Sequence, residues 1–146
     1  MFAVPPIPGW HALHPLVVHF PVALLLVVPV FVVLGLLLKT RGPGLTLAAL
    51  VLMALGTAGT FLAAETGEAT AELAETTQVV FASLTVLYAV LLFGPRLLRR
   101  DLERRVAVAL QLAFLVLYAA GSGILANTAH QGGRLVHVHG VHAMLN

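Results

Sequence analysis

Four long apolar stretches divide this sequence and constrain its fold more than any other feature. They cover about residues 14–38, 45–64, 77–93 and 106–126. A helix of roughly 20 apolar residues is long enough to cross the hydrocarbon core of a bilayer. In lipid a spanning segment must bond its own backbone groups, which favours helices over irregular chain. We therefore expect an all-α, integral membrane four-helix bundle, formed by a single domain over residues 1–146.

The composition supports a multi-pass membrane protein whose first partner is the lipid bilayer. Hydrophobic residues make up 60% of the chain and charged residues 10%, whereas a soluble domain carries about 25% charged residues. The chain has no cysteine, which excludes disulfides, thiolate metal sites and covalently attached c-type haem. The first ten residues lack a basic segment, so we do not expect them to be a cleaved signal peptide.

Prolines and small residues inside the apolar stretches predict how the helices pack. Pro21 and Pro29 each remove a backbone hydrogen bond, so we expect the first helix to be packed inside the bundle, where neighbours satisfy the freed carbonyls. Gly56 and Gly59 in the second stretch allow close approach of another helix or of a flat ring, and helix packing is the plainer interpretation. We expect the third helix to end at Gly94-Pro95.

The basic residues predict the orientation in the membrane. Seven of the eight Lys and Arg residues lie within two short segments, residues 39–41 and residues 96–105, and only Arg134 lies elsewhere. By the positive-inside rule these two segments are cytoplasmic. Both termini then lie on the outer, periplasmic or extracellular, side. This pattern reflects topology, so we expect no nucleic-acid partner.

All seven histidines fall on that same outer side, at the two ends of the chain. If folding brings the ends together, they form one histidine-rich site, and imidazole is the commonest side-chain metal ligand. The histidines are His11, His14, His19, His130, His137, His139 and His142.

His19 and His139 are the leading ligand candidates for a cofactor or a metal. His19 lies about one turn inside the first apolar stretch, where a polar group needs a partner. His139 precedes Gly140, which allows a turn back towards the bundle. We expect Gly132-Gly133 to break the fourth helix, so that the tail over residues 129–146 folds back. His14 and His130 are the substitutes, whereas His11 and His142 lie near the termini and are expected spectators.

Three chemistries suit histidines without cysteine. Two histidines approaching from opposite sides can hold a b-type haem in a helix bundle. Three or four histidines, with Glu65 or Glu68, can hold copper or zinc. A histidine–glutamate array can also transfer protons. The sequence contains no His-Glu-x-x-His and no Glu-x-x-His, so it lacks the zinc-protease and di-iron signatures.

Four glutamates precede the third apolar stretch. Their spacing of three, four and three residues would place them on one side of a single helix. They can be the solvated outer end of that helix, or contribute to a metal or proton site. They are Glu65, Glu68, Glu72 and Glu75.

Three segments resemble the motifs of a bacterial four-helix membrane family, domain of unknown function 2231. Residues 14–24 read HPLVVHFPVAL and resemble its opening motif, and residues 132–141 read GGRLVHVHGV and resemble its closing motif. Residues 66–72, TGEATAE, are similar to the middle motif of one branch. The resemblance places His14, His19 and His139 on motif positions, while His11, His137 and His142 are peculiar to this chain.

The same resemblance has implications for function and location. Some members are fused to Rieske iron–sulfur domains, which implies a redox partnership. The branch usually has further histidines at the start of the third helix, and residues 75–83 contain none here, which argues against a second cofactor on that helix. A bacterial family of this kind implies a multi-pass protein of the inner membrane.

Together these observations favour a membrane electron-transfer protein with b-type haem near the outer face. It would exchange electrons with quinol, a membrane complex or an outer-face carrier. The sequence favours an electron carrier or a subunit over a stand-alone enzyme. The alternatives are an accessory or structural subunit of a respiratory or photosynthetic membrane complex without its own cofactor, and a copper- or zinc-binding membrane protein.

Overall fold

The structure is a computed structural model made of four helices. It describes the backbone of residues 10–38, 40–65, 71–99 and 102–143, and the side chains of residues 19–38, 40–63, 75–99, 102–127 and 130. The helices are α1 (Trp10–Leu37), α2 (Gly42–Glu65), α3 (Ala71–Leu97) and α4 (Arg104–Ala143). The described residues contain no strand, and the predicted all-α fold is confirmed.

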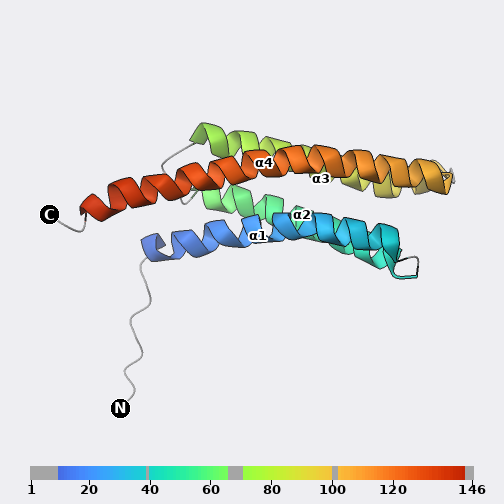
Figure 1. The fold of residues 1–146 in the computed structure, drawn as a ribbon, viewed down its shortest axis with the longest axis horizontal. Coiled ribbons are helices and arrows are strands. Elements are labelled where there is room, and N and C mark those ends of the chain that lie inside the picture. Colours follow the sequence, from blue (N-terminus) through green and yellow to red (C-terminus); the bar gives the residue numbers. More distant parts are fainter. Residues whose placement is uncertain (1–9, 39, 66–70, 100–101, 144–146) are drawn as a thin grey trace, which may run out of the picture.

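Consecutive helices run antiparallel and close into a bundle (Figure 1). The pairs α1–α2, α2–α3 and α3–α4 pack along each other, and α4 closes the bundle against α1. The start of α1 and the end of α4 therefore lie at one end, together with the end of α2 and the start of α3. We call this the histidine end, and the opposite end, where α1 and α3 end and α2 and α4 begin, the basic end. At the histidine end α4 extends beyond α2 and α3 (Figure 1).

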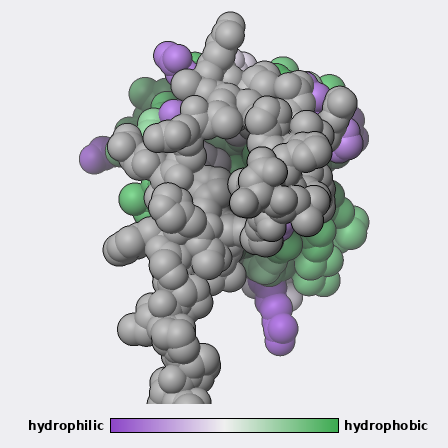
Figure 2. All heavy atoms as spheres, turned by 90° about the vertical axis from the view of Figure 1, so that its left-hand side faces the viewer, coloured by the Kyte–Doolittle hydropathy of each residue, from purple (hydrophilic) through white to green (hydrophobic). Residues whose placement is uncertain are grey.

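Each helix contains a segment long and apolar enough to cross a membrane. These segments are His19–Leu37, Gly42–Ala63, Glu75–Leu97 and Arg104–Asn127. Large apolar side chains such as Phe20, Leu62 and Val116 are more than 60% exposed on the outside of the bundle. Figure 2 looks onto the histidine end and shows hydrophobic atoms along the flank. In water such a surface would be strongly unfavourable, whereas lipid solvates it, so the molecule is a multi-pass membrane protein.

Helices α1 and α2 approach closely because α2 presents glycines to α1. A Cβ atom built on Gly56 would lie 2.7 Å from the Cγ atom of Leu25, and one built on Gly59 would lie 2.7 Å from the Cβ atom of Pro21. Any larger residue at these positions would force the two helices apart. The helix-packing interpretation of these glycines is confirmed, and the space beside them is filled by α1 rather than open to a flat ring.

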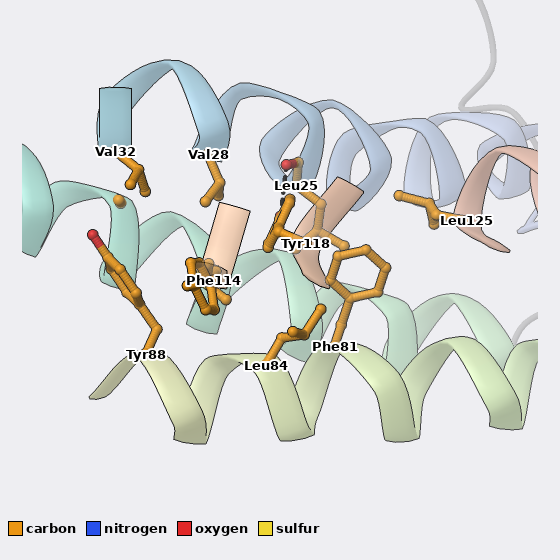
Figure 3. Close-up of a cluster of buried hydrophobic side chains, with 11 residues drawn as sticks. Leu25, Val28, Val32, Phe81, Leu84, Tyr88, Phe114, Tyr118 and Leu125 are labelled. Carbon is orange, nitrogen blue, oxygen red and sulfur yellow. Dashed lines mark hydrogen bonds between the residues drawn. The ribbon is translucent and has the colours of Figure 1, made fainter. Parts of the chain in front are cut away.

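The proline inside α1 is compensated by a side chain from α4. A residue at position 29 would normally donate its N–H to the carbonyl of Leu25, but Pro29 has no N–H. The hydroxyl of Tyr118 donates a hydrogen bond to this carbonyl oxygen at 2.7 Å, in the buried core (Figure 3). This contact confirms the expectation that a neighbouring helix satisfies a carbonyl freed by proline.

An aromatic row joins α3 to α4 in the core. Phe81 meets Tyr118 edge-on, with ring centroids 5.5 Å apart. Phe114 lies 5.8 Å from Tyr118 and stacks on Tyr88 at 4.6 Å. All four rings are almost fully buried (Figure 3). Ring pairs at such distances contribute about 0.5–1.5 kcal/mol beyond the burial of their area, so they hold α3 and α4 in register.

Threonines and a glutamine hydrogen-bond α2 to α3. The hydroxyls of Thr57 and Thr85 are 3.1 Å apart, and Thr85 donates to the carbonyl of Phe81 at 2.7 Å. Since a hydroxyl has one proton, Thr57 is the donor in the pair. Nearer the histidine end, Gln78 donates to the carbonyl of Thr60 at 3.2 Å. These bonds satisfy polar groups that lipid could not.

Two predicted helix ends are wrong. Helix α3 continues through Gly94 and Pro95 to Leu97, and it stops where Arg99 adopts a φ of 49°. Pro95 is tolerated because it lies in the last turn, where its ring displaces a single backbone bond. Helix α4 continues through Gly132 and Gly133 to Ala143. No described glycine has a positive φ, so Gly132 and Gly133 do not turn the chain. Each of them makes the helix about 1 kcal/mol less favourable than an alanine would.

The predicted glutamate stripe on one helix is also wrong. Glu65 is the last residue of α2, and Glu72 and Glu75 lie in the first turns of α3. Glu68 lies outside the described residues. The connection between the two helices interrupts the three- and four-residue spacing, so the carboxylates belong to separate elements at the histidine end.

Candidate functional site at the histidine end

The two histidine-bearing segments lie at the same end of the bundle, on the first turns of α1 and the last turns of α4 (Figure 1). His19 on α1 and His130 on α4 are exposed. For the other five histidines the structure describes the helical backbone only: His11 and His14 on α1, and His137, His139 and His142 on α4.

The hydrogen bond between Tyr118 and Leu25 sets the level of every histidine along the bundle axis. With a rise of 1.5 Å per residue, His14 lies about 17 Å outward from Leu25 and His130 about 18 Å outward from Tyr118. The backbones of these two residues thus lie at about the same level. His19 lies only about 9 Å outward from Leu25, whereas His139 lies about 32 Å outward from Tyr118.

The side of the helix on which each residue lies gives a second criterion. Position 14 is eleven residues before Leu25, which is three helical turns, so it lies on the same side of α1 as the buried Pro21 and Leu25. His19 lies on the exposed side of α1. Of the α1 candidates, position 14 is therefore in helical register with the buried residues of α1, and His19 is exposed.

The α4 candidates satisfy the two criteria differently. His130 matches the level of position 14, and its side chain is exposed. Position 139 is fourteen residues after the buried Leu125, so it is in helical register with that residue. It lies about 15 Å further out than position 14, because α4 is helical throughout. By level, position 14 pairs with His130; by side, position 139 rather than the exposed His130 is in register with the buried Leu125, so the two criteria favour different α4 residues.

The core limits where a cofactor can lie. Pro21, Leu25, Val28 and Val32 fill the inner side of α1, and Gly56 and Gly59 are covered by α1. A flat group the size of haem must therefore lie outward of Pro21, at the level of the histidines. Among the described side chains no group of three His, Asp or Glu residues is placed to hold a metal ion.

Several polar residues inside the apolar stretches were missed by reasoning from sequence. Tyr88, Gln111 and Tyr118 all have polar atoms in the core, and Thr57 is buried. The available signal was their location, since a polar side chain within a membrane-spanning helix normally faces the bundle interior. Their partners could not be read from the sequence.

The fold and this arrangement define a four-helix, multi-pass membrane protein whose histidines gather at one end. The chain belongs to the family described as predicted membrane protein (DUF2231), whose model matches residues 10–144. No curated protein and no solved structure matches the chain. The family membership agrees with the resemblance of the three sequence motifs and supports the membrane fold.

Proposed function

We propose that this protein is a membrane electron-transfer protein that holds one b-type haem at the histidine end of the bundle. The observation that carries the proposal is the convergence of the two histidine-bearing helix ends, with His14 and His130 at one level along the axis. Haem iron in such a site accepts and releases one electron, and imidazole ligands on two different helices can approach it from opposite faces.

His14 of α1 and His130 of α4 are the ligand pair that the shared level along the bundle axis supports. Position 14 is three turns outward from Leu25 on α1, and His130 is at about the same level on α4. His19 and His139, the first choices from sequence, are the competing pair. The packed core below Pro21 would shield the inner edge of the ring from water.

The location of the site suggests the partners. With the histidine end on the outer side of a bacterial inner membrane, the haem would exchange electrons with a redox carrier or a membrane complex at that face. Copper or zinc bound by the same histidines is the competing chemistry. An accessory subunit without a cofactor is the remaining alternative, and the experiment below distinguishes the three.

The test is the electronic spectrum of the purified protein after expression with sufficient haem, together with metal analysis. We expect a Soret band that shifts on reduction. His14→Ala and His130→Ala should each abolish the low-spin reduced spectrum or reduce haem content several-fold, because each removes one axial ligand. His142→Ala is the matched control, a histidine on the same helix, and should leave the spectrum unchanged.

The outcomes separate the alternatives. Loss of the spectrum in His19→Ala and His139→Ala, with His14→Ala and His130→Ala unaffected, would overturn the ligand pair. Stoichiometric copper or zinc with no Soret band would replace the haem proposal by the metal one. Absence of both haem and metal would leave the accessory-subunit function.

A further inference from the structure

Two polar atoms in the described core lack a hydrogen-bond partner. They are the hydroxyl oxygen of Tyr88 and the side-chain carbonyl oxygen of Gln111, and neither is accessible to solvent. Tyr88 is fully buried. Leaving a buried polar group without a partner costs about 1–3 kcal/mol, and no water from the lipid side can compensate it. The other buried polar groups considered above, Thr57, Thr85 and Tyr118, are bonded.

Both atoms lie at the level of Val32 in α1. The ring of Tyr88 stacks on Phe114 of α4, and its hydroxyl projects to the side of α1 near Val32 (Figure 3). Gln111 is seven residues before Tyr118, and Val32 is seven residues after Leu25. Because Tyr118 is bonded to Leu25 and the two helices are antiparallel, Gln111 comes level with Val32.

The two groups also lie on compatible sides of their helices. Gln111 is three residues before the buried Phe114, so it lies on the same side of α4, next to the ring on which Tyr88 stacks. Tyr88 and Gln111 thus approach one interior region from α3 and α4. Neither oxygen atom is hydrogen-bonded to the other or to any other described group, and a third group between them could bond to both.

We propose that Tyr88 and Gln111 bind one water molecule inside the bundle, towards the basic end. Their chemistry is complementary, since a phenol hydroxyl donates one proton and an amide oxygen only accepts. The Tyr88 hydroxyl donates to the water oxygen, and the water donates to the Gln111 carbonyl oxygen. The surrounding side chains, Val32 and Phe114, are apolar, which leaves these two groups to orient the water. Buried waters typically hold together polar groups that would otherwise be unsatisfied.

A double-mutant cycle on the full chain in micelles tests the coupling between the two residues. Tyr88→Phe and Gln111→Met should each raise the unfolding equilibrium constant by about ten-fold. The double variant should be hardly worse than either single variant, because the first substitution already removes the bridge. Gln78→Met is the matched control, since Gln78 bonds to Thr60 elsewhere in the bundle. Its effect on the unfolding equilibrium constant should be independent of Tyr88→Phe, so the two fold-changes should multiply in the double variant.

Water-edited solid-state NMR in lipid tests the ligand itself. Magnetisation should pass rapidly from water to the Tyr88 side chain in the wild-type protein, and this transfer should be lost in Gln111→Met. If the effects of Tyr88→Phe and Gln111→Met on the unfolding equilibrium constant simply multiply, the two residues do not share a site and the proposal is overturned. Strong coupling with no transfer from water would show a direct bond and would equally overturn the proposal. Neither result depends on the presence of haem at the histidine end.

Discussion

At the scale of single residues, one hydroxyl compensates for one proline. Pro29 leaves the carbonyl of Leu25 without its helical donor, and Tyr118 supplies a replacement from α4 at 2.7 Å. The contact ties the first and last helices of the chain together in a region that is fully buried. A proline in α1 and a tyrosine in α4, 89 positions apart in the sequence, therefore act as one unit.

We expect Tyr118→Phe to destabilise the bundle by about 1–2 kcal/mol, because the Leu25 carbonyl loses its donor in an apolar environment. In a Pro29→Ala background the loss should be smaller, since the N–H of the new alanine can bond to the same carbonyl. The measurement is reversible unfolding in mixed micelles for the four proteins of this cycle. Equal losses in both backgrounds would show that the hydroxyl does not act through this carbonyl.

At the scale of helices, the packing of α1 on α2 depends on the absence of side chains. Gly59 lies against the ring of Pro21, which cannot rotate away, and Gly56 lies against Leu25. On α4, Gly123 has no atom within 4 Å of the position that a Cβ would occupy. Glycine is therefore required for close packing at Gly56 and Gly59 of α2, whereas no described neighbour requires it at Gly123 of α4.

These two glycines make a matched pair for mutation. Gly59→Ala should destabilise the protein by about 1–3 kcal/mol, because the new methyl group would overlap Pro21 and push α1 from α2. Gly123→Ala should be neutral or stabilising by up to about 1 kcal/mol, since alanine is the better helix former. Thermal unfolding of both variants checks the difference. A Gly59→Ala protein as stable as Gly123→Ala would contradict the close packing of α1 on α2.

At the scale of the whole molecule, the bundle has one end rich in histidine and one rich in arginine. Arg41, Arg96, Arg99, Arg104 and Arg105 are all exposed at the basic end. This separation follows from the antiparallel order of the helices, which places both basic connections on one side. Anionic lipid and the insertion machinery both favour such a side in the cytoplasm.

We predict that the basic end is cytoplasmic and the histidine end faces outward. Reporter fusions after Arg41 and Arg100 should be active only for a cytoplasmic reporter, and a fusion after Gly67 only for an outer-compartment reporter. Fusions of both reporter types at each position serve as mutual controls. An active outer-compartment reporter at Arg41 would reverse the orientation and place the proposed haem site in the cytoplasm.

The sequence by itself determined the four spans, the all-α class and the shared end of the histidines, because these depend on local properties. Hydropathy over about twenty residues is set by neighbours in the chain, and lipid permits little besides helices. Four consecutive spans with short connections must alternate in direction, which brings residues 14 and 130 to the same end. That the carbonyl freed by Pro29 needs another donor was likewise predictable, although the identity of the donor was not.

Only the tertiary structure decided which residues meet across helices. The level of His14 against His130, the match of Tyr118 to Leu25 and the filling of the space at Gly56 all depend on axial register and rotation between helices. These are set jointly by many side chains packing at once and leave no trace in the local pattern. The continuation of α4 through Gly132 and Gly133 was missed because glycine permits a turn without requiring one, and here it adopts the helical conformation.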